Sequence, residues 1–182
     1  MACNLTQGRQ EVCKESIGGL QGVYFINYTT GSFTHQTPSD PSSPITALPS
    51  GSTVYFYQLK GTSAYTETVN TSRENGTTFF SQEATLNLKK LTNEMTTQLK
   101  LMAYGRPQVI VWTNAGDALL VGEKLGADVT AGTIQTGGAL GDLYGYSVTL
   151  TGMEQFPAAF LSGSSTTNPF GFLTSQPTIV YN

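Results

Sequence analysis

Apolar and polar positions alternate along much of the chain, which is the pattern of half-buried β-strands. Alternating or continuously apolar runs cover 19–30, 52–61, 64–88, 107–123 and 132–155. The last run alternates most regularly: Tyr146, Val148 and Leu150 fall on one face, while Ser147, Thr149 and Thr151 fall on the other. The run 52–61 is apolar on both faces. It predicts a strand that is central in a sandwich or packed against another subunit.

The run 64–88 contains the pair Asn75-Gly76, a strong signal for a two-residue hairpin in a type I′ turn. Such a turn would place Thr66 opposite Thr85 and Thr68 opposite Glu83. Each arm is then ten residues or more, which at roughly 3.3 Å per residue is longer than a typical strand. We expect a hairpin of this length to lie against a neighbour.

One segment changes to helical spacing. Met95, Leu99 and Met102 form an apolar stripe, Thr92 precedes them as a natural N-cap, and Gly105 follows them. The spacing predicts a helix over about 93–104 that packs on one face or end of a sheet.

The order of these elements predicts a mainly β fold: a β-barrel or β-sandwich with one short flanking helix, a long hairpin and extended arms. We divide the chain into an N-terminal arm (1–18), a single β-domain (19–161) and a C-terminal docking arm (162–182). The β-domain contains an inserted loop at 31–51 with prolines at 38, 41, 44 and 49. Because proline removes backbone donors, we expect this loop to be an exposed arm.

Charge is sparse and unevenly placed. Charged residues make up 12% of the chain and the net charge is −3, which argues against a protein that binds nucleic acid by neutralising phosphates. Residues 1–106 carry a net charge of +1, and residues 107–182 carry −4. This asymmetry is compatible with surfaces that meet in an assembly and equally with chance in a low-charge chain.

Candidate chemistry is scarce. The single histidine, His35, lies in the proline-rich loop, where we expect it to be solvated. Glu67 and Glu83 make no recognisable acid–base motif, and we find no spacing typical of phosphate binding or of a metal site. Two cysteines, Cys3 and Cys13, do not make a zinc site; they can pair if the arm folds back, but we expect free thiols. We therefore expect neither an enzyme nor a cofactor.

We expect no targeting signal in this sequence. The polar N-terminus does not suggest a signal peptide, and no apolar run is long enough to suggest a membrane span.

Taken in order over about 53–161, the strand, long hairpin, short helix, second hairpin and final strand resemble the tail tube proteins of tailed bacteriophages. The resemblance to the tube proteins of contractile injection systems is looser. The opening LTQGRQEVCKESIGGLQGVYFINY also resembles the start of virion proteins from phages of Bacteroidetes hosts. The resemblance to these families suggests no role for Cys3 and Cys13.

The resemblance implies hexameric rings that stack into a tail tube, with the inner strands of all subunits forming one lumen barrel. The protein would be part of the virion tail, assembled in the host cytoplasm. Its partners would be itself and other tail proteins, and DNA would pass through the lumen without specific binding. Hydroxyl and acidic groups suit such a lumen, because Lys or Arg contacts would retain the DNA. The candidate lumen residues are Thr66, Glu67, Thr68, Glu83, Ser147, Thr149 and Thr151.

Four basic residues around the helix are candidates for the subunit interface, where we expect them to meet the acidic C-terminal half of a neighbour: Lys89, Lys90, Lys100 and Arg106. Two alternatives stay open. The same fold serves ring-forming head-closure, tail-terminator and adaptor proteins, and a carbohydrate- or receptor-binding β-domain would use exposed aromatic residues. Trp112, in an alternating strand, is expected to be a core residue rather than a sugar platform.

Overall fold

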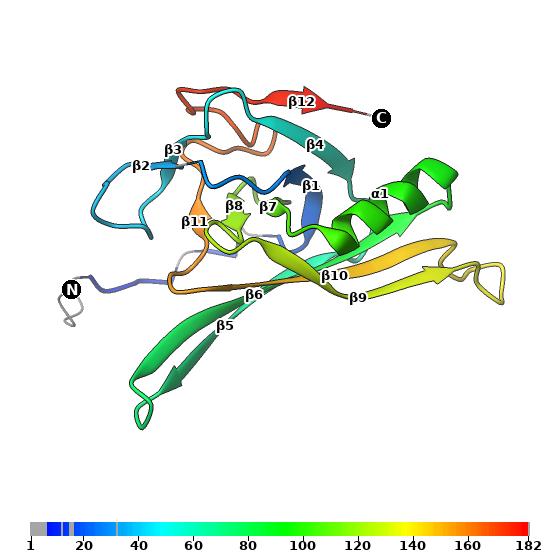
Figure 1. Ribbon diagram of the computed structural model, residues 1–182, viewed down its shortest axis with the longest axis horizontal. Helices are drawn as coiled ribbons and strands as arrows, with labels where there is room; N and C mark the ends of the chain where they lie inside the picture. Colours follow the sequence, from blue (N-terminus) through cyan, green and yellow to red (C-terminus); the bar gives the residue numbers. More distant parts are fainter. Residues whose placement is uncertain (1–6, 12, 15–16, 32, 182) are drawn as a thin grey trace.

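The computed structural model describes residues 7–11, 13–14, 17–31 and 33–181. Over these residues the fold is mainly β with a single helix, as the sequence predicts. Two large sheets face each other, and irregular segments form a further layer on the outer side of one of them (Figure 1). Neither sheet closes on itself, so within one chain the fold is a sandwich and not a barrel.

The first sheet has six strands. Its two central strands are almost entirely buried, which explains their continuously apolar sequences. In spatial order the strands are β11 (Ala159–Phe160), β8 (Ala118–Val121), β7 (Gln108–Thr113), β1 (Leu20–Ile26), β4 (Thr53–Gln58) and β12 (Thr178–Val180). All neighbours are antiparallel except β12, which runs parallel to β4. The doubly apolar run 52–61 is thus β4, and both of its faces are packed within this chain.

The second sheet is an antiparallel sheet of four strands, in the order β5 (Ala64–Ser72), β6 (Thr77–Lys89), β10 (Gly145–Glu154) and β9 (Ala127–Gln135). The β5–β6 register differs from our prediction by two residues: Thr66 lies opposite Glu83, and Thr68 lies opposite Ser81. The turn has four residues, because Gly76 has a positive φ of 64° but Asn75 does not, whereas a type I′ turn needs both.

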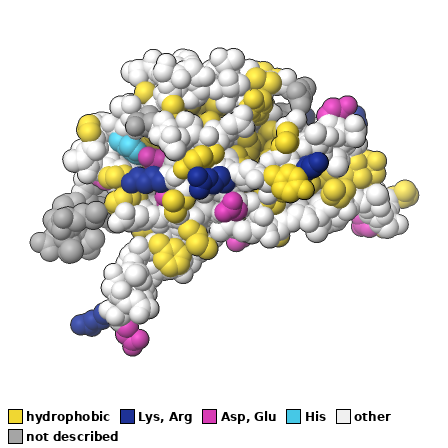
Figure 2. Space-filling view, in the orientation of Figure 1, with side chains coloured by type: hydrophobic (Ala, Val, Ile, Leu, Met, Phe, Trp, Pro, Cys, Tyr) yellow, Lys and Arg dark blue, Asp and Glu magenta, His cyan; other side chains and the backbone are white. Residues whose placement is uncertain are grey.

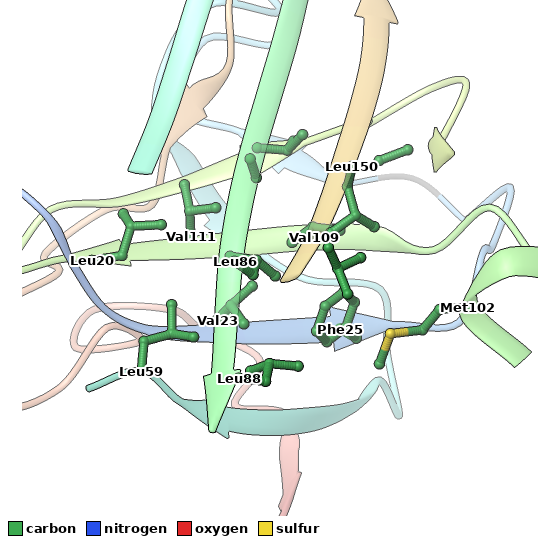
Figure 3. Close-up of a cluster of buried hydrophobic side chains, with 14 of the residues drawn as sticks. Leu20, Val23, Phe25, Leu59, Leu86, Leu88, Met102, Val109, Val111 and Leu150 are labelled. Atoms are coloured by element: carbon green, nitrogen blue, oxygen red, sulfur yellow. The ribbon is translucent and has the colours of Figure 1, made fainter. Parts of the chain in front are cut away.

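The main core lies between the two sheets (Figure 3). Val23, Phe25 and Val111 from the first sheet meet Leu86 and Leu150 from the second, and the strands of the two sheets cross one another there. The predicted inward face of β10 is confirmed, since Tyr146, Val148 and Leu150 are buried.

A second core covers the other side of the six-stranded sheet, where the 31–51 loop and the C-terminal segment pack onto their own domain. Phe33, Ile45 and Leu48 of the 31–51 loop are buried, and the loop contains two short paired strands, β2 (Thr34–His35) and β3 (Ile45–Ala47). The loop is therefore not an exposed arm. From the C-terminal segment, Phe170 and Leu173 are buried beside it.

The helix α1 (Asn93–Tyr104) lies beside the mouth between the sheets (Figure 1). The predicted N-cap is confirmed, because Thr92 Oγ1 accepts a hydrogen bond from Met95 N. The hydroxyl of Tyr146 donates to Thr92 O at 2.9 Å, which ties the start of the helix to the four-stranded sheet. Met102 is buried against the main core, as the apolar stripe predicts.

Cys13 is exposed and free. Cys3 lies outside the described residues, so free thiols at both positions stay a prediction. Among the described residues, no helix combines the length and apolar character that crossing a membrane requires.

Candidate functional site

The most distinctive surface is the outer side of the four-stranded sheet, which we call the hydroxyl face. In both ladders of β6, residues that lie opposite each other point to the same side, and these pairs bring together most of the predicted lumen residues. The hydroxyl face comprises Thr66, Thr68, Ser81, Glu83, Thr85, Asn87, Asp128, Thr133, Ser147, Thr149, Thr151 and Met153.

Acidic side chains are few on the hydroxyl face, and they are Glu83 and Asp128, each paired across a strand with Thr151. Thr130 occupies a bulge in β9, and its hydroxyl lies 2.9 Å from that of Thr151. The surface is thus largely neutral and rich in hydroxyl groups. It offers hydrogen bonds to water, and the cation that shares its side of β6 is Lys89, at the end of the strand. Away from that end, the described residues of the face carry no Lys or Arg that would attract phosphate.

Glu67 does not belong to this face, contrary to our grouping. Successive side chains of a strand point to opposite sides, so Glu67 faces inward between Thr66 and Thr68. Its carboxylate accepts hydrogen bonds from Gln82 Nε2 at 3.2 Å and from Ala158 N at 3.0 Å. The buried Gln82 in turn accepts from Gly122 N at 2.9 Å. Because Gly122 and Ala158 adjoin β8 and β11, this network links the two sheets.

Both edges of the four-stranded sheet are open among the described residues. β5 pairs with β6 alone and β9 pairs with β10 alone, so each of these nine-residue strands has one free side. Three successive antiparallel pairings separate them, so β5 and β9 run in opposite directions. Each strand carries a single charged residue, Glu67 or Asp128, and so lacks the charges that commonly protect an edge from pairing.

The β5–β6 hairpin projects beyond the body of the domain (Figure 1). Its tip carries the charged pair Arg73 and Glu74 (Figure 2), but its shaft is apolar in part. Val69 and Phe79 are 59% and 39% exposed, respectively. Among the described residues, no other element covers the outer half of this hairpin, so the prediction that it lies against a neighbour stays a prediction.

The four candidate interface cations do not form one cluster. Lys89 and Lys90 are exposed where β6 ends, beside the groove at the start of α1. Lys100 lies over the ring of Tyr104, with Nζ 5.8 Å from the centroid. Arg106 is stacked at 4.0 Å on the ring of Tyr28 of the same chain.

The acidic residues of the C-terminal half are largely used within the chain. The buried carboxylate of Glu154 accepts from the amides of Lys124 and Leu125, both at 2.8 Å. Asp142 accepts from Ala139 N and Gly138 N, and these hydrogen bonds lower its pKa. Asp117, Asp128 and Asp142 are exposed, and of these Asp142 is already hydrogen-bonded within its own turn.

His35 is not the solvated loop residue that we expected. Its side chain is only 10% exposed; Nδ1 lies 2.9 Å from Ser43 O, and Nε2 lies 2.9 Å from Glu123 Oε1. Burial alone would lower its pKa, but the hydrogen bonds to Ser43 and Glu123 outweigh it, so the pKa lies above the ordinary 6.5. No local sequence signal connects His35 to Glu123, because the contact depends on how the 31–51 loop folds.

Trp112 is a core residue, as expected. It is 9% exposed, and its Nε1 donates to Ser165 O at 2.9 Å, so it anchors the C-terminal segment and offers no platform for a sugar. A groove of about 540 Å³ between β4 and the start of α1 is lined in part by Tyr55 and Tyr57.

Comparison of the chain with protein-family models, with curated proteins and with solved structures yields no match. The functional argument therefore depends on the geometry of the chain itself.

Proposed function

We propose that this protein is a structural component of a bacteriophage virion, forming hexameric rings that stack into the tail tube through which DNA is delivered. The number six and the stacking come from the resemblance to tail tube proteins. The observation that carries the proposal is the four-stranded sheet with two open, oppositely directed edges.

Pairing β5 of one copy with β9 of the next continues the antiparallel ladder from subunit to subunit. This contact uses different surfaces on the two partners, so it is heterologous, and repeated rotation closes it into a ring. Edge pairing also satisfies the free backbone groups of both strands. The single-chain sheet is then one segment of a larger closed barrel, which accounts for its open form in the isolated chain.

In such a ring the hydroxyl face lines the lumen. The main core lies behind it, and the layer formed by the 31–51 loop and the C-terminal segment faces outward. A lumen of hydroxyls with a few carboxylates does not retain DNA, because each Lys or Arg contact to a phosphate would add affinity and slow the passage. Glu67 is excluded from the lumen by its inward direction.

Chemical cross-linking tests the edge pairing directly. In a variant with both native cysteines replaced by Ser, Thr68→Cys and Ala131→Cys place one thiol on each edge strand. A short bismaleimide tolerates a small error in register and should produce a ladder of covalent species ending at the hexamer. Each single-cysteine variant serves as a control and should stop at the dimer or below.

The matched control pair combines Thr68→Cys with Thr174→Cys, which is exposed on the opposite layer. If the two pairs give the same weak ladder, β5 and β9 are not neighbours and the proposed ring is wrong.

Charge reversal tests the interface cations. Lys89→Glu together with Lys90→Glu should weaken ring or tube assembly, most strongly at low salt, where the exposed charges are least screened. Undisturbed assembly at low salt would remove these lysines from the interface while leaving the edge pairing intact.

A further inference from the structure

The contacts of His35 favour its protonated form. Both of its ring nitrogens lie 2.9 Å from groups that only accept hydrogen bonds: the carbonyl oxygen of Ser43 and the carboxylate of Glu123. A neutral imidazole has a single N–H and can make one of these bonds, whereas the imidazolium has two N–H groups and makes both. The cationic ring is therefore the form that satisfies both contacts.

These two bonds tie together separate parts of the molecule. Ser43 belongs to the tip of the 31–51 loop, whereas Glu123 lies in the connection between β8 and β9, 88 residues from His35 in sequence. The tip is internally ordered, since Gln36 N donates to Pro44 O and Ser43 N donates to Asp40 O. Figure 2 shows the histidine and an acidic side chain in contact at the surface.

The base of the loop is held independently of His35. Phe33 precedes the tip and Ile45 follows it, and both are buried in the second core. Loss of the His35 proton therefore weakens the bond between the loop and Glu123 and the bond that orders the tip at Ser43, without unfolding the segments that flank the loop.

We propose that His35 is a protonation-dependent latch: its imidazolium holds the 34–44 loop on the β8–β9 connection, and loss of the proton releases that loop. The pKa of His35 is raised in the folded protein, so the latch is closed below pH 6.5 and opens as the pH rises through the folded pKa. This direction is opposite to that of a switch opened by acid.

The surrounding charges agree with this direction. Glu123 and, from within the loop, Asp40 favour the imidazolium. Lys124 lies next to Glu123, but its Nζ is placed over the ring of Phe156, 5.0 Å from the centroid. The carboxylate of Glu154, at the end of β10, is committed to the amides of Lys124 and Leu125.

The test is an NMR titration of the untagged protein, in which the single histidine gives one set of imidazole signals. We expect the pKa of His35 to lie above 6.5, and Glu123→Gln to lower it by about one unit or more, because an opposite charge is removed. The matched control Glu74→Gln, at the tip of the β5–β6 hairpin, should leave it unchanged.

Hydrogen exchange of the amides of Gln36, Asp40 and Ser43 follows the loop itself. Relative to intrinsic rates, their protection should fall by about tenfold as the pH rises through the measured pKa. A wild-type pKa at or below 6.5, or protection that stays constant across the titration, would overturn the latch. Because both readouts use the wild-type chain, the test holds even if Glu123→Gln does not fold.

Discussion

The inward position of Glu67 allows a quantitative prediction, because Glu83 provides a matched control. Glu83 follows Gln82, the partner of Glu67 in β6, and points to the opposite face of the same sheet. Glu67→Ala removes the acceptor for Gln82 Nε2 and for Ala158 N. Hydrogen bonds to a charged group contribute ~1.5–3 kcal/mol each when buried. Since Glu67 is half-buried and water can replace part of the loss, we expect about 2 kcal/mol in total. Glu83→Ala removes an exposed side chain and should cost no more than about 0.5 kcal/mol.

Urea unfolding of the monomer, followed by the fluorescence of the single tryptophan, measures both variants. For a chain of this size, 2 kcal/mol corresponds to a fall in Tm of roughly 4–8 °C. A double-mutant cycle of Glu67→Ala with Gln82→Met should show coupling, because the two side chains share a hydrogen bond. If Glu67→Ala and Glu83→Ala lose equal stability, the proposed link between the sheets does not exist.

Three further substitutions test other parts of the fold. Thr92→Ala should destabilise the protein by about 1 kcal/mol in urea unfolding, since it removes the N-cap of α1, and the control Thr97→Ala should cost less. Trp112→Phe should accelerate chymotrypsin cleavage at the exposed Phe172, because Ser165 loses its hydrogen bond; unchanged cleavage would show that the indole does not anchor the segment. Leu86→Ala should cost ~2–5 kcal/mol by circular dichroism, and Thr85→Ala much less, whereas similar losses would contradict the assignment of faces.

Elements with strong periodicity were predictable from sequence. Local sequence patterns specify the helix and its N-cap, the alternation around Val148 and the doubly apolar β4. The structure keeps each of these patterns. The strand β9 is different: it is Ala127–Gln135, and most of its side chains are exposed, so it offers little hydrophobic pattern to detect.

The errors have identifiable physical causes. The hairpin register depends on the turn type. The turn type depends on the sign of φ at Asn75, and the residue type alone does not determine that sign. Glu67 was assigned to the lumen face because it is acidic. Strand alternation places its side chain on the other side of the sheet from those of Thr66 and Thr68. The burial of Phe33 and Phe170 depends on a few apolar anchors separated by small residues, which follow neither the strand nor the helix period.

The functional surface was predictable in part. Alternation indicated the hydroxyl positions on β10. The order of strands in the sheet was needed to show that they lie on one surface with those of β5 and β6. The contact of His35 with Glu123 joins two irregular segments, and only the folded chain brings them together.

Negative-stain electron microscopy of the purified protein, with light scattering on the same sample, tests the central claim most directly. The account predicts closed rings of six copies, alone or stacked into tubes, with the hydroxyl face toward the lumen. Single rings that never stack would keep the edge pairing but favour a closure or adaptor role. A protein that remains monomeric at high concentration and gives no β5–β9 cross-links would contradict the account.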